Sequence, residues 1–193
     1  MLEGIATVRC GGLSVNQLSL EQGCLYWITG LSGAGKTTIG NLLFKELKAR
    51  KPNVFLLDGD VARWAYGDAA GYTRQEREAV AYRHARVCKM IVDQDIDVIC
   101  CTVSMFDGVR QWNRQHFDKY REIFLDVPMD VLIKRDKKQL YSRTQEGATQ
   151  NVVGLDQQSE YPRSPDLRIV NDGASTPQQI IEQIRAAFPE LRR

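Results

Sequence analysis

The stretch "GLSGAGKTT", Gly30 to Thr38, decides the fold of this chain. It fits the pattern G-x-x-x-x-G-K-[ST], and it follows an apolar run and precedes a stretch with helical spacing, which is the context that a phosphate-binding loop requires. The glycines let backbone N–H groups converge on phosphate oxygens, and the start of the following helix adds partial positive charge. The stretch, called the phosphate loop below, therefore predicts nucleotide binding between a strand and a helix.

Two side chains of the phosphate loop are expected to contact the nucleotide and its metal ion. Lys36 is expected to reach the β and γ phosphates, and the Thr37 hydroxyl is expected to ligate Mg²⁺. The other positions of the loop that we predict to bind the nucleotide are Gly30, Ser32, Gly33, Ala34, Gly35 and Thr38.

The rest of the chain predicts an α/β domain. From Cys24 onward, apolar runs of about five residues alternate with helical stretches, as in a parallel sheet with crossover helices. The expected strands are residues 24–29, 54–58, 97–102, 122–126 and 167–170. The expected helices face the core through Ile39, Leu42, Leu43 and Leu47, through Val80, Val87, Met90 and Ile91, and through Ile180, Ile181, Ile184 and Phe188.

We therefore expect a P-loop NTPase-like parallel sheet of about five strands flanked by helices. Residues 1–23 are expected to form an N-terminal arm or short extended pieces, and residues 24–193 a single domain. Residues 135–165 are polar and basic and have no long apolar stripe, which favours a basic lid over the site rather than a solvated face.

Composition excludes several classes of function. Twenty-six basic and twenty-four acidic residues give a net charge of +2, too balanced to predict a nucleic-acid or membrane surface. The five cysteines are odd in number and have no C-x-x-C spacing, which favours buried thiols in a reducing cytoplasm. The sequence shows neither a secretion signal nor an apolar run long enough to span a membrane.

The stretch "VFLLDGDVARWAYGD", residues 54–68, ends an apolar strand on two carboxylates, Asp58 and Asp60. Ligands of open α/β sheets bind at the carboxyl ends of the strands, beside the phosphate loop. The run "DVICCT", by contrast, leads to Thr102 and Ser104 rather than to an acid, and the chain has no N-K-x-D motif. This placement of the acids suits a small-molecule kinase better than a motor ATPase or a GTPase.

A kinase needs a carboxylate that orients or deprotonates the attacking hydroxyl. We assign Asp60 to the acceptor hydroxyl and Asp58 to the water shell of Mg²⁺, while the reverse assignment and an ordinary turn after the strand stay open. Arg63 binds an anionic acceptor or is a solvated helix residue.

The aromatic and histidine residues around the acids have weaker patterns. Two interpretations of the aromatic residues stay open. Either they form a wall that stacks on the substrate base, or they pack against their own helix; the residues are Trp64, Tyr66 and Tyr72. His84 and His116 have no partner acid at suitable spacing, so we expect them to play no part.

Five ordered stretches resemble the adenylylsulfate kinase family, from about Trp27 to Asp172. They are "WITGLSGAGKTTIG", "LLDGD" followed by Arg63, "GYTRQER" ending at Arg77, "RDKKQLY" and "NVVGLD". The resemblance implies ATP with Mg²⁺ as the donor, the 3'-hydroxyl of a small-molecule nucleotide as the acceptor, and a homodimer. It also implies acceptor contacts by Arg77 and a mobile basic lid that carries Lys138. The lid begins at Arg135, which is expected to bind the nucleotide. Ser104 matches a serine near the transferred phosphate, unless it caps a helix at Asp107.

The departures from the family fall on the acceptor side. Val61 replaces the asparagine of D-G-D-N, Val80 replaces the asparagine of E-N-I-R-R, and Val152 replaces an aromatic residue that stacks on the substrate base. Tyr72 keeps the other aromatic face, and losing one face forfeits on the order of 1 to 3 kcal/mol of stacking.

The stretch "SMFDGVRQWNR", residues 104–114, is similar to a branch of the family found with capsule synthesis, whose members phosphorylate cytidine diphosphoramidate. Two acceptors remain open, adenylylsulfate and cytidine diphosphoramidate, and the departures favour the second. A catalytically silent nucleotide sensor is the alternative from another class, against which the presence of Lys36, Asp60 and Lys138 argues.

Overall fold

The computed structural model describes residues 22–67, 71, 73–135 and 159–192. Five parallel strands form one sheet in the order β2-β3-β1-β4-β5. The strands are β1 (Leu25–Thr29), β2 (Val54–Asp58), β3 (Asp97–Thr102), β4 (Tyr120–Asp126) and β5 (Leu167–Val170). The prediction of a five-stranded parallel sheet is confirmed, with β4 beginning at Tyr120 rather than at Glu122.

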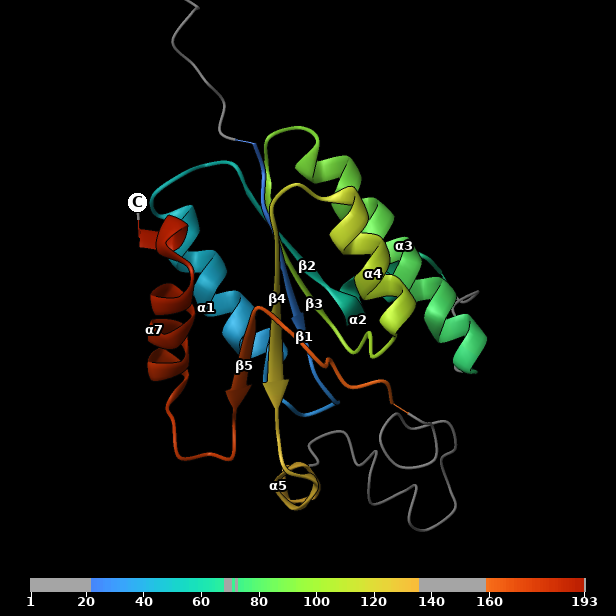
Figure 1. Ribbon diagram of the computed structural model, residues 1–193, viewed down its shortest axis with the longest axis vertical. Helices are drawn as coiled ribbons and strands as arrows, with labels where there is room; N and C mark the ends of the chain where they lie inside the picture. The colour runs from blue at the N-terminus through green and yellow to red at the C-terminus, as the bar shows by residue number, and fades with distance from the viewer. Residues whose placement is uncertain (1–21, 68–70, 72, 136–158, 193) are drawn as a thin grey trace, which may run out of the picture.

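Helices cover both faces of this sheet (Figure 1). The helices α1 and α7 pack together on one face, and α3 and α4 pack on the other. The helical elements are α1 (Lys36–Lys48), α2 (Gly59–Ala65), α3 (Arg74–Val92), α4 (Asp107–His116), α5 (Met129–Lys134), α7 (Pro177–Ala187) and the short 3₁₀ helix η2 (Pro189–Arg192). Two of the longer helices, α3 and α7, begin with complete capping boxes, which satisfy backbone N–H groups of the first turn.

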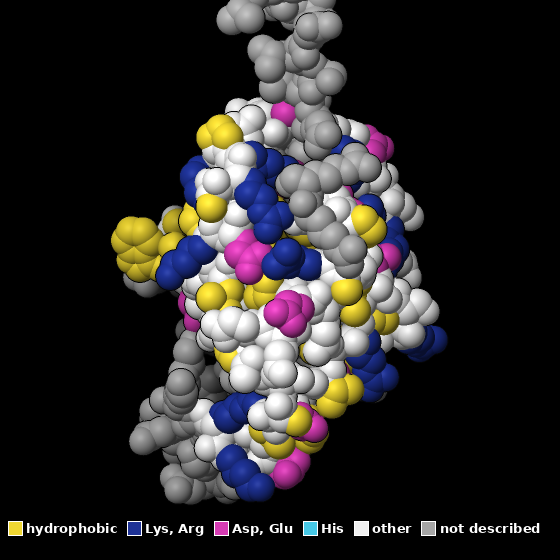
Figure 2. All heavy atoms as spheres, turned by 90° about the vertical axis from the view of Figure 1, so that its left-hand side faces the viewer, with side chains coloured by type: hydrophobic (Ala, Val, Ile, Leu, Met, Phe, Trp, Pro, Cys, Tyr) yellow, Lys and Arg dark blue, Asp and Glu magenta, His cyan; other side chains and the backbone are white. Residues whose placement is uncertain are grey.

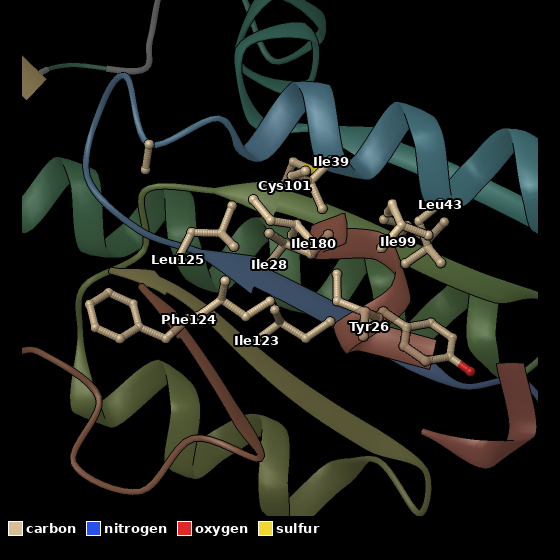
Figure 3. Packing of buried hydrophobic residues seen from close by; sticks show 14 of the residues in the cluster. Tyr26, Ile28, Ile39, Leu43, Ile99, Cys101, Ile123, Phe124, Leu125 and Ile180 are labelled. Carbon is tan, nitrogen blue, oxygen red and sulfur yellow. The ribbon is translucent and has the colours of Figure 1, made fainter. Parts of the chain in front are cut away.

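The core lies on the two sides of β1. Tyr26 and Ile28 pack toward α1 and α7, while Leu25 and Trp27 pack toward α3 and α4. Figure 3 shows the first of these layers, in which Ile39 of α1 and Ile180 of α7 meet the side chains of the central strands. Because both faces are covered, β1 is buried along its whole length, which is why its sequence is continuously apolar rather than alternating.

One residue of the predicted face of α3 was wrong. Val80 is buried and Val87 and Ile91 pack partly buried against the core, as expected, but Met90 is 67% exposed. The buried positions are Val80, Ala81, His84, Ala85, Cys88 and Val92. The prediction weighted large apolar residues, but alanine and cysteine allow the closer approach of α3 to the sheet.

The cysteines among the described residues are buried and free, as predicted. They are Cys24, Cys88, Cys100 and Cys101. Burial raises the pKa of Cys24 and of Cys101 to about 12 each, so both are thiols at neutral pH. Within the described ranges, no helix is both long and apolar enough to cross a membrane.

A buried carboxylate joins α4 to the sheet. Glu122 of β4 is 2% exposed and accepts a hydrogen bond of 2.7 Å from Nη2 of Arg114, with Nε of Arg110 at 3.5 Å. Burial raises the pKa of Glu122, and the two guanidinium groups oppose that rise. At the surface, basic and acidic side chains are interspersed on the face beside α7 (Figure 2), as the small net charge predicts.

Candidate active site

A cavity of about 970 Å³ lies at the carboxyl ends of the strands. Its wall combines the phosphate loop, the start of α2, the inner face of α3 and the turn after β3. Of the predicted site residues, the cavity is lined by Ser32, Gly33, Gly35, Lys36, Thr37, Thr38, Asp58, Asp60, Arg63, Arg77, Ser104 and Arg135. Gly30 and Ala34 belong to the loop without lining the cavity, and Tyr72, Lys138 and Val152 lie outside the described residues.

The phosphate loop takes the backbone path that its glycines allow. Gly33 and Gly35 have φ angles of 79° and 90°, in the left-handed region that glycine adopts without strain. Gly35 precedes the first turn of α1, so the N–H groups of that turn point into the loop. Lys36 is 9% exposed, and its Nζ donates to the carbonyl of Leu31 at 2.8 Å. The positive φ angles and the Lys36 contact together fix the path of the loop at the start of α1.

Asn171, which follows β5, braces the phosphate loop. Its Nδ2 donates to the carbonyl of Ala34 at 3.0 Å, and its Oδ1 lies 3.4 Å from Nη2 of Arg135. Asn171 is 7% exposed, so this contact is shielded from water. It joins residues far apart in the sequence, and no sequence motif indicated it.

Thr37 and Asp58 lie together beside the loop. The Thr37 hydroxyl donates to Oδ2 of Asp58 at 2.6 Å. The other carboxylate oxygen, Oδ1, accepts from the backbone N–H of Asp60 at 2.9 Å and caps α2. These two hydrogen bonds fix the orientation of Asp58. Asp60, two residues later in α2, is exposed and lines the cavity.

Two arginines from different helices face the same cavity. Arg63 of α2 donates through Nη1 to the carbonyl of Gly71 at 3.0 Å. Arg77 lies in the first turn of α3, and both side chains are half-buried. Both arginines line the cavity that Asp58 and Asp60 also line, and guanidinium groups are suited to binding an anionic acceptor.

Ser104 lies in the turn between β3 and α4. It is 3% exposed, and its Oγ has no hydrogen-bond partner among the described residues. The alternative in which Ser104 caps a helix at Asp107 was wrong, because the residue before α4 is Phe106 and Ser104 makes no cap hydrogen bond. The backbone N–H of Asp107 instead donates to Oε2 of Glu160 at 2.6 Å.

Glu160 fixes the end of the predicted lid segment. Its N–H donates to the carbonyl of Met105 at 3.1 Å, its own carbonyl accepts from Nη2 of Arg110 at 2.7 Å, and its carboxylate pairs with Arg74. Glu160 thus ties the chain after residue 158 to the turn that carries Ser104. No sequence motif indicated this contact.

His84 was expected to play no part. It is 3% exposed and lines the cavity from α3. Burial, together with the charge of Arg63, lowers the pKa of His84 to about 4, while Asp58 opposes that change. The imidazole is therefore neutral at pH 7.

The wall of stacking aromatic residues is not formed by Trp64 and Tyr66. Trp64 is 80% exposed, and Tyr66 packs on the ring of His84 with ring centroids 5.5 Å apart. Neither lines the cavity, and Tyr72, the third member of the predicted wall, lies outside the described residues.

The fold and the site define a class of protein. A parallel sheet with the phosphate loop after its central strand, and with carboxylates after the strand two positions away, is the arrangement of P-loop phosphotransferases. Residues 22–170 match the family model described as adenylylsulphate kinase. The chain therefore belongs to the adenylylsulphate kinase family of phosphotransferases.

The relatives within the family differ in their named substrates. The cytidine diphosphoramidate kinase of Campylobacter jejuni is 39% identical over 160 residues, which cover 83% of this chain and 93% of the relative. The adenylyl-sulfate kinase of Halothermothrix orenii is 33% identical and covers 79% of this chain and 82% of the relative. The Mycobacterium tuberculosis APS kinase CysC, in complex with AMPPNP and APS, has a TM-score of 0.81 at 24% identity. That alignment covers 87% of this chain and 98% of the neighbour, and it supports the fold.

Proposed function

We propose that the chain transfers the γ-phosphate of ATP to the 3'-hydroxyl of cytidine diphosphoramidate. The observation that carries the kinase part is that a single cavity brings together the phosphate loop, the carboxylates Asp58 and Asp60, and the arginines Arg63 and Arg77. Donor and acceptor sites must adjoin in this way for direct transfer.

The donor would be held at the phosphate loop. The backbone amides and Lys36 bind the β and γ phosphates, with Asn171 keeping the loop in place. Thr37 and Asp58 offer a hydroxyl and a carboxylate that already touch, and oxygen donors of this kind fit Mg²⁺. When bound, Mg²⁺ neutralises charge on the phosphates and orients them.

The acceptor would enter between α2 and α3. Asp60 accepts the proton of the 3'-hydroxyl as its oxygen forms a bond to the γ-phosphorus, and the bond from that phosphorus to the β-phosphate oxygen breaks. Arg63 and Arg77 hold the anionic end of the acceptor. Lys138, in the segment beyond Arg135, is proposed to close over the transferring phosphate and to exclude water.

The choice of acceptor has two supports. The Campylobacter jejuni relative, named a cytidine diphosphoramidate kinase, is 39% identical across most of both chains. Val80 is 4% exposed and gives the cavity wall an apolar surface where the family resemblance implies an asparagine. Valine cannot form the hydrogen bonds to an acceptor that an amide side chain at this position could form. Adenylylsulfate remains the second candidate because adenylyl-sulfate kinases also match at about a third identity.

We extend the proposal to the setting of the enzyme. Residues 24–193 would act as one cytoplasmic kinase domain with a lid at about 135–165, working as a homodimer in capsule modification. The small-molecule nucleotide would be its substrate, without nucleic acid or membrane as partner.

The test is ADP release from ATP and Mg²⁺ with each acceptor in a separate reaction, with Lys36→Ala as the inactive control. Turnover with the cytidine compound, at a kcat/KM at least about ten times that for adenylylsulfate, is the expected result. Turnover with adenylylsulfate alone would assign the chain to sulfate activation. ATP binding that depends on Lys36, without turnover of either compound, would support the silent sensor.

A further inference from the structure

Glu160 joins the starts of two helices that border the cavity, although it does not line the cavity itself. Oε2 of its carboxylate accepts from the backbone N–H of Asp107, the first residue of α4, at 2.6 Å. Oε1 of the same carboxylate pairs with Nη2 of Arg74, the first residue of α3. One carboxylate therefore holds the two helix starts together.

On the α4 side, Glu160 fixes the turn after β3. Its N–H donates to the carbonyl of Met105 and its carboxylate accepts from the N–H of Asp107, so the backbone is held on both sides of Phe106. Ser104 and Phe106, which lie on this turn, line the cavity. The residue before α4 supplies no side-chain cap, and Glu160 instead provides an acceptor and a negative charge at the positive end of this helix.

On the α3 side, Glu160 fixes the helical turn that carries Arg77. Arg77 follows Arg74 by about one turn and lines the cavity, where the proposed function assigns it to the anionic end of the acceptor. The guanidinium group of Arg74 also lies over the ring of Phe106, 5.5 Å from its centroid. A partly exposed ion pair contributes little alone, but here the N–H of Asp107 orients the same carboxylate.

The backbone of Glu160 is anchored separately from its side chain. Its carbonyl accepts from Nη2 of Arg110 at 2.7 Å, and Arg110 is 4% exposed. Nε of Arg110 lies 3.5 Å from Oε1 of the buried Glu122 of β4. A substitution of the Glu160 side chain thus removes the links to α3 and α4 while the backbone contacts of this residue stay.

We propose that Glu160 is a positioning residue for the acceptor, whose carboxylate sets the placement of Arg77 relative to the turn that carries Ser104. This inference rests on the proposed function in placing a nucleotide acceptor at Arg77, and it is the same for both candidate acceptors. Among the described residues, Glu160 has no hydrogen bond to the phosphate loop, where ATP is proposed to bind. Its loss should therefore weaken acceptor binding and leave ATP binding unchanged.

The test measures the KM for ATP and the KM for the acceptor, using whichever of cytidine diphosphoramidate and adenylylsulfate the wild type phosphorylates faster. The variants are Glu160→Ala, which removes both links, and Glu160→Gln, whose amide oxygen can still accept from the N–H of Asp107. Glu190→Ala is the matched control, because Glu190 forms an ion pair of similar exposure with Arg121 and does not line the cavity. Urea unfolding of each variant shows that it is folded before kinetics are measured.

We expect Glu160→Ala to raise the KM for the acceptor by about 5- to 30-fold, since a small misplacement of binding groups costs up to about 100-fold. The KM for ATP, and both values for Glu190→Ala, should stay within about twofold of wild type, and Glu160→Gln should recover part of the loss. An equal rise in both KM values, or no rise in either, would overturn the inference.

The same experiment separates the two proposals. If the wild type turns over one of the acceptors and Glu160→Ala behaves like Glu190→Ala, the inference alone fails. If the wild type turns over neither acceptor, the proposed function fails and the inference fails with it.

Discussion

Replacing His84 by Gln should make the stability of the protein less sensitive to acid. The pKa of His84 is lowered from its ordinary 6.5 to about 4 in the folded chain, first by burial and then by Arg63. In the unfolded chain the same imidazole binds a proton below about pH 6.5, so protonation favours unfolding. The contribution of neutral His84 to stability is therefore complete above pH 6.5 and is lost as the pH falls toward 4.

The size of this effect follows from the two pKa values. At pH 5 almost all unfolded molecules carry the proton on this residue and few folded molecules do, which favours unfolding by about 2 kcal/mol. Above pH 7 the same contribution is close to zero. Between pH 7.5 and 5, wild type should thus lose about 2 kcal/mol more of its free energy of unfolding than His84→Gln.

The assay is urea unfolding of both proteins at the two pH values, without nucleotide, followed by circular dichroism. Carboxylates elsewhere titrate in both proteins, so their contributions to the pH dependence of stability cancel when the two proteins are compared. Parallel losses in the two proteins would show that His84 is not held neutral by burial.

Three further substitutions test other parts of the site. Asp60→Asn should lower kcat by about 100-fold or more with the affinity for ATP unchanged, as loss of a general base predicts, while Asp93→Asn at the far end of α3 should leave kcat unchanged. A kcat above about a tenth of wild type would refute the role of Asp60. Asn171→Ala leaves the carbonyl of Ala34 without its donor, so calorimetry should show weaker ATP binding by about 1 kcal/mol or more, and unchanged binding would contradict the bracing role. Val80→Asn should raise kcat/KM for adenylylsulfate relative to the cytidine compound several-fold, and an unchanged ratio would remove Val80 from the argument.

The strands and the phosphate loop could be predicted because their signals are local. β1 and β3 are short, fully buried runs made mostly of apolar residues, and the loop motif lies between a strand and a helix as its mechanism demands. Two of the shorter helices, α2 and α5, have too few residues to show a period. α4 was missed because two of its buried positions are the polar Arg110 and Asn113, which carry no hydrophobic signal.

Other parts of the site depend on contacts that no single sequence displays. Asn171 contacts Ala34, which lies 137 residues earlier in the sequence. Glu160 contacts Asp107, which lies 53 residues earlier, in the first turn of α4. His84 had a signal that was overlooked, since a position four residues after Val80 lies on the same face of the helix. The prediction placed the large side chain of Met90 on the buried face, and the expected face therefore did not include His84.

The central claim is that this site phosphorylates the cytidine compound in preference to adenylylsulfate. The most direct measurement places both acceptors at equal concentration in one reaction with limiting ATP and Mg²⁺, and identifies the products by phosphorus NMR. The account predicts that most of the new phosphate appears on the 3'-oxygen of cytidine diphosphoramidate. A new phosphate found mainly on adenylylsulfate, or a release of inorganic phosphate that neither acceptor changes, would contradict it.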